Sequence, residues 1–157
     1  MEMWRSGVQN VYELHEWQKV DEFSALLRDV CGELDLGRDK AWLLYLLEQA
    51  GRLMREAVEE GWNREFLAEF ILGISEALTV LGLIDYYLLF LRHEGYLSVD
   101  RADEVAGRLG ELQDALSSLA GRLREALRGR RGREFPRLGH RWHGTQGSDA
   151  RGGLFSC

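Results

Sequence analysis

The sequence predicts an all-α protein: an antiparallel up-down-up-down four-helix bundle over residues 1–128, followed by a disordered or partner-ordered tail over residues 129–157. The single proline and the abundant Leu, Ala, Glu and Arg favour helices. Four segments space their apolar residues by three and four, and almost no segment alternates apolar and polar residues as a strand does. Connections of only a few residues between long helices make successive helices antiparallel.

The first two predicted helices cover residues 11–34 and 39–60. Gly37 follows the first helix, because glycine readily adopts the left-handed conformation that ends helices. Asp39 is a suitable N-cap for the second helix, since its side chain can accept hydrogen bonds from free backbone amides. Gly61 is expected to end the second helix.

The other two predicted helices cover residues 63–94 and 98–128. Gly95 is expected to end the third helix, and Ser98 can cap the fourth. The leucines of the fourth helix are spaced by three and four with little drift, which is typical of the seam of a bundle.

The third predicted helix is apolar on too many sides to be covered by its own bundle alone. Residues 77–91 contain only two strongly polar side chains, Thr79 and Asp85. A membrane-spanning helix of ~20 residues is the first alternative, but Glu76 and Asp85 at bilayer depth would each cost roughly 2.5–3.5 kcal/mol. We therefore expect a soluble chain whose copies meet through the third helix, at Phe70, Ile74, Leu81, Ile84, Tyr87, Leu88 and Leu91.

Glu76 and Asp85 interrupt this apolar helix, and buried carboxylates need partners. We expect Arg52 or Arg55 of the second helix to pair with them. Such an ion pair would fix helix register or a subunit contact rather than act in catalysis.

Five glycines fall inside predicted helices, where each costs up to ~1 kcal/mol relative to alanine. We expect close approach between helices to compensate, and a general compositional bias toward Gly, Ala and Arg is the alternative for each glycine. The five are Gly51, Gly73, Gly82, Gly107 and Gly110.

Two cysteines, Cys31 and Cys157, make no disulfide framework, and this cysteine usage suits a reducing compartment. Polar residues break up the N-terminal segment, which therefore does not resemble a signal peptide. We expect a cytoplasmic protein with no membrane partner.

The net charge of −6 conceals an asymmetry along the chain. Residues 1–119 carry 11 Lys or Arg and 23 Asp or Glu, whereas residues 120–157 carry nine Arg and three acidic residues. Arginine binds phosphate bidentately, and aromatic rings stack on unpaired bases. The predicted nucleic-acid site is therefore the C-terminal end, at Arg122, Arg124, Arg128, Arg130, Arg131, Arg133, Arg137, Arg141 and Trp142. A merely solubilising tail is the alternative.

The residue types favour no catalytic or metal centre. His140 and His143 are spaced like metal ligands, but glycines flank them and no Cys or carboxylate cluster completes a site. His15 and His93 fit ordinary polar roles at helix ends. The chain has no phosphate loop, Ser-His-Asp arrangement or dinucleotide fingerprint, so we expect a protein that is not an enzyme and binds no cofactor or metal.

Four short segments carry motifs of a known family. Residues 13–20 (ELHEWQKV) contain a variant of Leu-x-x-Trp-Gln-Lys-Ala, and residues 57–61 (AVEEG) one of Asn-Ile-Ala-Glu-Gly. Residues 66–77 (FLAEFILGISEA) are similar to Phe-Leu-x-Ile-Ala-x-Gly-Ser-x-x-Glu, and residues 93–98 (HEGYLS) to Leu-Gly-Tyr-Leu-Ser. In order and spacing, over roughly residues 11–127, the chain resembles the bacterial four-helix-bundle proteins of intervening sequences in large-subunit ribosomal RNA genes.

The chain departs from that family in two ways. The usual Gly-Arg-Gly-Ser insertion is reduced to residues 62–65 (WNRE), and the body of the protein is more acidic than the resemblance leads us to expect. The short junction resembles a sister group, the accessory variability determinant proteins of diversity-generating retroelements. That resemblance implies a four-helix bundle that assembles as a homopentameric ring and assists a reverse transcriptase and its RNA.

We therefore expect a non-catalytic, homo-oligomeric accessory protein that binds RNA through its arginine-rich end, in partnership with a reverse transcriptase. The alternative is a protein–protein interaction scaffold that binds no nucleic acid. The acidic body favours the scaffold, as do Trp4, Trp17 and Trp62, which we expect to be exposed.

Overall fold

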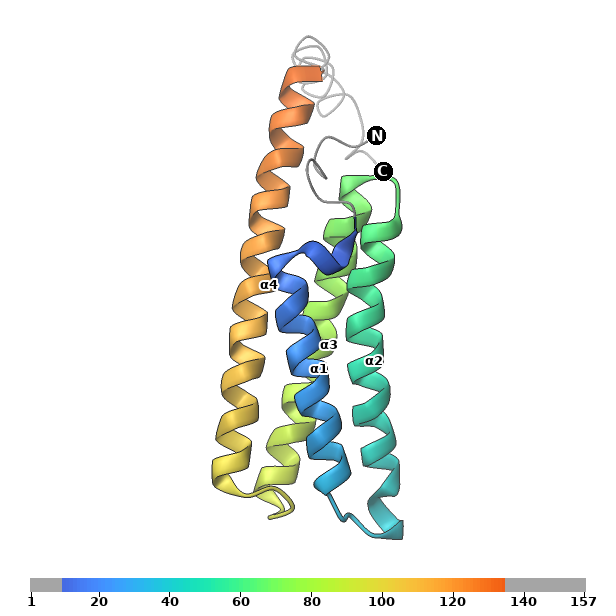
Figure 1. The fold of residues 1–157 in the computed structure, drawn as a ribbon, viewed down its shortest axis with the longest axis vertical. Coiled ribbons are helices and arrows are strands. Elements are labelled where there is room, and N and C mark those ends of the chain that lie inside the picture. The colour runs from blue at the N-terminus through green and yellow to red at the C-terminus, as the bar shows by residue number, and fades with distance from the viewer. Residues whose placement is uncertain (1–9, 135–157) are drawn as a thin grey trace, which may run out of the picture. The chain divides into compact units, whose positions relative to one another are not determined.

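The computed structural model describes residues 10–134 and confirms the predicted all-α four-helix bundle (Figure 1). The chain comprises two compact units, Met1–Leu123 and Arg124–Cys157. In order, the elements are the short 3-10 helix η2 (Val11–Glu13), α1 (His15–Glu33), the 3-10 helix η3 (Arg38–Lys40), α2 (Ala41–Asn63), α3 (Leu67–His93) and α4 (Val99–Glu134).

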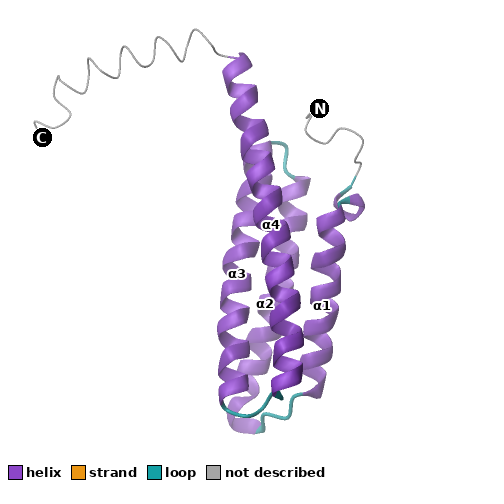
Figure 2. Ribbon diagram, turned by 90° about the vertical axis from the view of Figure 1, so that its left-hand side faces the viewer, coloured by secondary structure: helices purple, strands orange, loops and turns teal. Residues whose placement is uncertain are grey.

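The helices of the first unit run up and down alternately, as the ion pairs between them show. Arg55 of α2 binds Asp21 of α1 at 2.5 Å, and Arg92 near the end of α3 lies 3.5 Å from Asp103 near the start of α4. The start of α4 in turn binds the end of α1, through the pair Arg101–Glu33. Figure 2 shows α4 between α1 and α3.

Several helix ends differ from the predicted ones. Asp39 lies inside η3, and α2 begins after Lys40, so the prediction of Asp39 as an N-cap is wrong. The prediction that Gly61 ends α2 is also wrong, because α2 continues to Asn63. The fourth helix continues past residue 128 to Glu134, so residues 129–134 of the predicted tail are helical. Residues 135–157 lie outside the described part of the chain.

The turn between α3 and α4 has the predicted caps. Gly95 has a φ of 80°, and the Tyr96 amide donates to the Leu91 carbonyl at 2.9 Å, which closes the end of α3. The Ser98 hydroxyl accepts a hydrogen bond from the Arg101 amide at 3.2 Å, at the start of α4.

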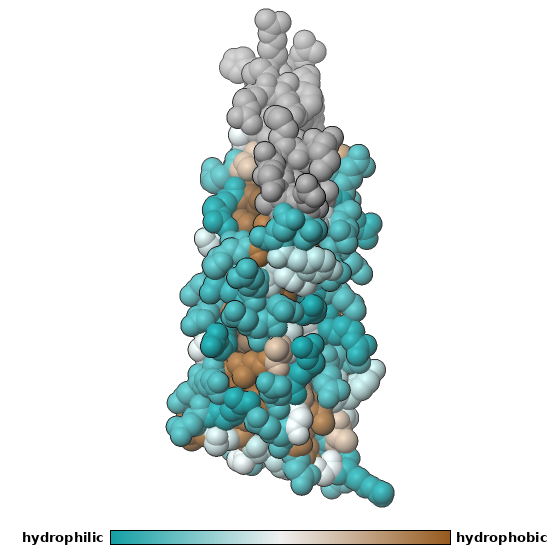
Figure 3. All heavy atoms as spheres, in the orientation of Figure 1, coloured by the Kyte–Doolittle hydropathy of each residue, from teal (hydrophilic) through white to brown (hydrophobic). Residues whose placement is uncertain are grey.

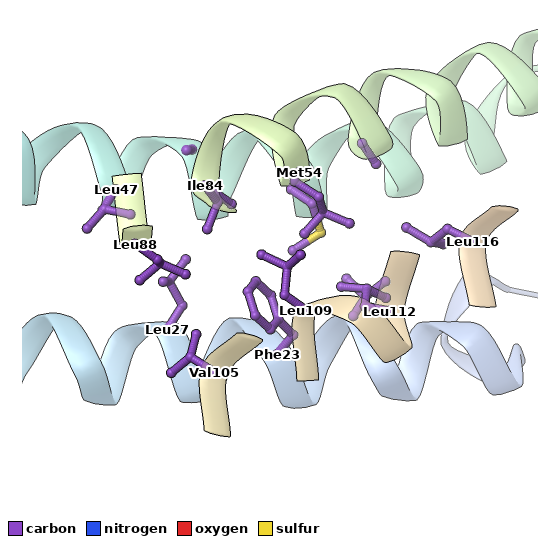
Figure 4. Close-up of a cluster of buried hydrophobic side chains, with 14 of the residues drawn as sticks. Phe23, Leu27, Leu47, Met54, Ile84, Leu88, Val105, Leu109, Leu112 and Leu116 are labelled. Atoms are coloured by element: carbon purple, nitrogen blue, oxygen red, sulfur yellow. The ribbon is translucent and has the colours of Figure 1, made fainter. Parts of the chain in front are cut away.

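Each helix of the first unit contributes apolar side chains to one core. The outer face on the α1 side is mostly hydrophilic (Figure 3), whereas the apolar side chains point inward between the helices (Figure 4). Trp17 and Trp62 belong to this core, with 5% and 4% of their surface exposed, so the prediction that they are exposed is wrong. Trp4 lies outside the described residues. Members of the core shown in Figure 4 are Phe23, Leu27, Leu47, Met54, Ile84, Leu88, Val105, Leu109, Leu112 and Leu116.

The helices α2 and α3 make the closest backbone contact described in this unit. A Cβ atom added to Gly73 would lie 2.5 Å from the Ala57 carbonyl oxygen and 3.1 Å from the Gly61 Cα. Close approach therefore explains Gly73, and it also applies to Gly51, where a Cβ would lie 2.9 Å from the Leu27 Cδ2.

The other three helix glycines do not fit this explanation. A Cβ added at Gly82, Gly107 or Gly110 would have no neighbour within 4 Å among the described residues. The prediction of close approach is wrong at these three positions, because each faces open space.

Most of the residues predicted to join two copies of the chain lie in the core instead. Within the single chain, Phe70, Ile74, Leu81, Ile84, Leu88 and Leu91 are buried, and Tyr87 is partly buried. These six buried side chains face the other three helices of their own bundle, so a second copy cannot reach them. The prediction of these six residues as a subunit contact is therefore wrong.

The two carboxylates of α3 also differ from expectation. Glu76 is exposed and Asp85 is only partly buried. Arg55, one of their predicted partners, binds Asp21 of α1 instead. The prediction of a buried ion pair at Glu76 and Asp85 is wrong, because neither carboxylate is buried.

Replacing Gly73 with alanine should destabilise the bundle by about 1–3 kcal/mol, because the new methyl group would overlap backbone atoms of α2 that cannot move independently. Gly107→Ala is the matched control. It fills open space on α4 and should stabilise by roughly 0.5–1 kcal/mol through helix propensity. Urea unfolding of both variants measures this difference, and equal effects would contradict the proposed contact.

Candidate functional site

The arginines of α4 within the first unit bind carboxylates of α1. Because the two helices are antiparallel, three arginines along α4 reach three glutamates along α1. The first of them is held most extensively: Arg101 makes two hydrogen bonds to Glu33, at 2.7 and 3.1 Å, and one to Glu104 at 2.6 Å. The three pairs are Arg101–Glu33, Arg108–Glu22 at 3.6 Å and Arg122–Glu16 at 2.6 Å.

Arg122 therefore differs from the other residues of the predicted nucleic-acid site. Its partner Glu16 is mostly buried, with a side-chain exposure of 14%. A phosphate that bound Arg122 would have to compete with this carboxylate. Arg122 is better explained as part of the bundle.

The second unit begins with two arginines on the surface of α4. Arg124 and Arg128 are both exposed and lie one helical turn apart, on the same side of α4. Arg128 is 2.8 Å from Glu125, and both side chains of this pair are more than two-thirds exposed. Exposed pairs of this kind contribute little to stability, so the Arg128 guanidinium can exchange its partner for a phosphate.

The rest of the predicted arginine site is described only in part. Arg130, Arg131 and Arg133 lie within α4 by their backbone. Arg137, Arg141 and Trp142 lie outside the described residues, as do His140 and His143.

The outer sides of α2 and α3 carry exposed apolar side chains that the sequence patterns did not single out. On α3, Leu72 and Tyr86 are 63% and 68% exposed, and Leu83 lies on the same side of the helix. We call the whole set the α2–α3 apolar surface: Trp42, Tyr45, Leu53, Leu72, Leu83, Tyr86 and Leu89.

The contact between the two helices brings the members of this surface from α2 and α3 together. Gly61 near the end of α2 meets Gly73 near the start of α3, so the start of α2 must lie beside the end of α3. Lys40 confirms this arrangement, because its Nζ is 3.0 Å from the Tyr96 hydroxyl and 5.9 Å from the Phe90 ring centre. The aromatic side chains at the start of α2 are therefore at the level of Tyr86 and Leu89.

Among the described residues, α3 is the one helix long and apolar enough to cross a membrane by length and composition. Less than half of its most apolar stretch is buried in the bundle. Its outer side therefore remains available to a partner.

No group of three His, Cys, Asp or Glu residues that could hold a metal ion occurs within residues 10–134. His15 is the first residue of α1 and His93 the last of α3, and both are exposed. Their positions fit the ordinary polar roles predicted for them.

The chain matches no protein-family model, no curated protein and no solved structure. The resemblance to the intervening-sequence proteins and to the retroelement accessory proteins therefore stays a prediction.

Because Arg101 makes three hydrogen bonds between and within helices, whereas Arg128 makes one exposed pair, their replacement should have different consequences. Arg101→Gln should lower the thermal midpoint by roughly 2–4 °C, and Arg128→Gln should change it by less than about 1 °C. Circular dichroism melting of both variants tests this. An equal loss in the two variants would show that Arg128 also serves the fold.

Proposed function

We propose that this protein is a non-catalytic, self-associating accessory protein that binds RNA through the arginine-rich end of α4. The observation that carries the proposal is the exposure of Arg124 and Arg128 on a helix that continues through Arg130, Arg131 and Arg133. The net positive charge of residues 120–157 supports it, since phosphate contacts supply most of non-specific nucleic-acid affinity.

The division of the arginines along α4 supports the same proposal. Arg101 and Arg122 bind glutamates of α1 at 2.7 and 2.6 Å, whereas Arg108 lies 3.6 Å from Glu22. Among the described residues, Arg128 pairs with Glu125 of its own helix, and both side chains are exposed. Arg128 is therefore more available to a polyanion than Arg101 or Arg122.

Self-association is proposed through the α2–α3 apolar surface, in place of the buried residues predicted from the sequence. Seven large apolar side chains, each at least 46% exposed, lie on two adjacent helices. Large apolar side chains left exposed on adjacent helices favour a protein–protein contact. Several arginine-rich ends in one assembly would raise the affinity for RNA by avidity. The homopentameric ring and the reverse transcriptase partner rest on the resemblance alone.

A protein–protein interaction scaffold is the second candidate, and the same apolar surface favours it. If the surface binds a different protein rather than a second copy, the bundle would act as an adaptor. Trp17 and Trp62 no longer support this candidate, because both are buried.

Removal of the arginines should weaken RNA binding. Arg124→Gln/Arg128→Gln should reduce the affinity for a single-stranded RNA oligonucleotide about tenfold at low salt, because two phosphate contacts are lost. A chain that ends after Leu127 should lose more. Fluorescence anisotropy measures the affinity, and the slope of log K against log salt should decrease by about 0.7 for each lost contact.

The control for this experiment is Arg38→Gln/Arg92→Gln, which makes the same change in net charge within the first unit. It should bind RNA nearly as tightly as the unchanged protein. If the chain that ends after Leu127 binds RNA as tightly as the full chain, the arginine-rich end is not the binding site.

Charges placed in the α2–α3 apolar surface should prevent self-association. We expect the unchanged protein to sediment as an oligomer at micromolar concentration. Leu83→Glu/Tyr86→Glu should sediment at the 18.0 kDa mass of the single chain, because burying two carboxylates at a contact is costly. Ser117→Glu, at an exposed position of α4, is the control and should leave the oligomer intact.

A monomeric unchanged protein would contradict self-association and leave the scaffold as the better candidate. Affinity capture after nuclease treatment then separates the two functions. Loss of a bound protein from Leu83→Glu/Tyr86→Glu, with RNA binding unchanged, would favour the scaffold.

A further inference from the structure

A groove of about 450 Å³ lies between α1 and α2. Its volume is in the range of sites that hold small molecules. The side chains that matter for its chemistry come from both helices: Ser24, Leu27, Arg28 and Cys31 from α1, and Gly51 and Arg52 from α2.

The register of the two helices places Arg28 and Arg52 across the groove from each other. Leu27 faces Gly51, and Asp21 binds Arg55 one turn further along. Because the helices are antiparallel, the residues that follow Leu27 and Gly51 lie at nearly the same level. Two positive side chains therefore flank one opening.

Arg28 and Arg52 have no hydrogen bond or ion pair to any residue in the part of the chain that the structure describes. The third arginine of the groove differs, since Arg55 binds Asp21 and stacks over Trp17 at 5.0 Å. The lining includes one carboxylate, Glu48. The two unpaired guanidinium groups thus outnumber the single carboxylate of the groove, whereas acidic residues outnumber basic ones over residues 1–119.

The inner part of the groove contains a buried polar atom without a partner. Ser24 is 6% exposed, and its hydroxyl makes no hydrogen bond within residues 10–134. Burying a hydroxyl in this way is unfavourable unless it gains a partner. The hydroxyl oxygen is enclosed by the packing around α1, so this cost belongs to the core and not to a contact with a ligand.

The remaining inner surface is apolar. Leu27 and Cys31 are buried, and the Leu27 side chain packs closely against the Gly51 backbone. Burial, with a smaller contribution from the charge of Glu48, raises the pKa of the Cys31 thiol to about 11. The thiol is therefore neutral at physiological pH and adds to an apolar wall.

We propose that the α1–α2 groove binds a small organic anion. Its carboxylate or phosphate group lies between Arg28 and Arg52, and its apolar part lies against Leu27, Cys31 and Gly51. Planar guanidinium groups bind such oxyanions bidentately, and the nearby Glu48 favours a single negative charge over two. This site does not depend on RNA binding or self-association.

Isothermal titration of the full chain with four probes tests the proposal. Hexanoate and hexyl phosphate should bind with a Kd of roughly 0.1–1 mM. Inorganic phosphate should bind at least about tenfold more weakly, because it lacks the apolar part, and hexylammonium should not bind. Equal binding of inorganic phosphate and the two hexyl anions would indicate an adventitious ion only and would overturn the proposal.

Variants identify the residues involved. Arg28→Gln/Arg52→Gln should weaken hexanoate binding at least about tenfold. Both arginines are exposed, so the double variant should fold, which its circular dichroism checks. Arg38→Gln/Arg92→Gln is the charge-matched control and should bind hexanoate as the unchanged protein does. Unchanged affinity in the double variant would sink the proposal.

The NMR signals of the groove give a second readout that locates the ligand. Saturating hexanoate should shift the backbone amide signals of Cys31 and Gly51, because both residues line the occupied groove. The same addition should leave these signals in place in Arg28→Gln/Arg52→Gln. Binding without a shift at Cys31 or Gly51 would place the anion elsewhere and reject this site.

Discussion

The direct contact between the backbones of α2 and α3 at Gly61 and Gly73 constrains the rest of the bundle. A side chain at Gly73 would collide with the Ala57 carbonyl oxygen, so only glycine permits this approach. The contact sets the register of the α2–α3 pair and turns the core-facing sides of both helices toward α1 and α4. The opposite sides of the same helices must then face outward, and on α3 that side is apolar.

The register of α4 against α1 determines which charged side chains of the two helices form ion pairs. Antiparallel packing brings three arginines of α4 to three glutamates of α1. Arg101 and Arg122 make the shorter of these pairs, and a polyanion would have to compete with Glu33 and Glu16 for them. Further along the same helix, Arg128 pairs with its exposed neighbour Glu125. One arginine-rich helix thus contains arginines that join α4 to α1 and an arginine whose partner lies on α4 itself.

Much of the fold could be predicted from local patterns. The spacing of apolar residues predicts four helices, and Gly95 and Ser98 predict the turn between α3 and α4, because these signals act within a few residues. The end of α2 could not be predicted in this way. Glycine at this position usually indicates the end of a helix. In this bundle, however, Gly61 stays helical, and its backbone packs against Gly73 of α3. Local patterns also could not distinguish Gly73, which contacts α2, from Gly107 and Gly110, which have no close neighbour. That difference depends on residues far away in the sequence.

The sequence by itself determined that the chain forms four helices, that α3 is apolar on several sides and that positive charge gathers at the C-terminal end. These properties depend on composition and on residues that are close in the chain. Only the tertiary structure decided which side of α3 is covered, which arginines bind α1 and where Arg28 and Arg52 meet. A helix with apolar residues all round carries no periodic signal of its inner side, so its orientation depends on contacts with residues far away in the sequence.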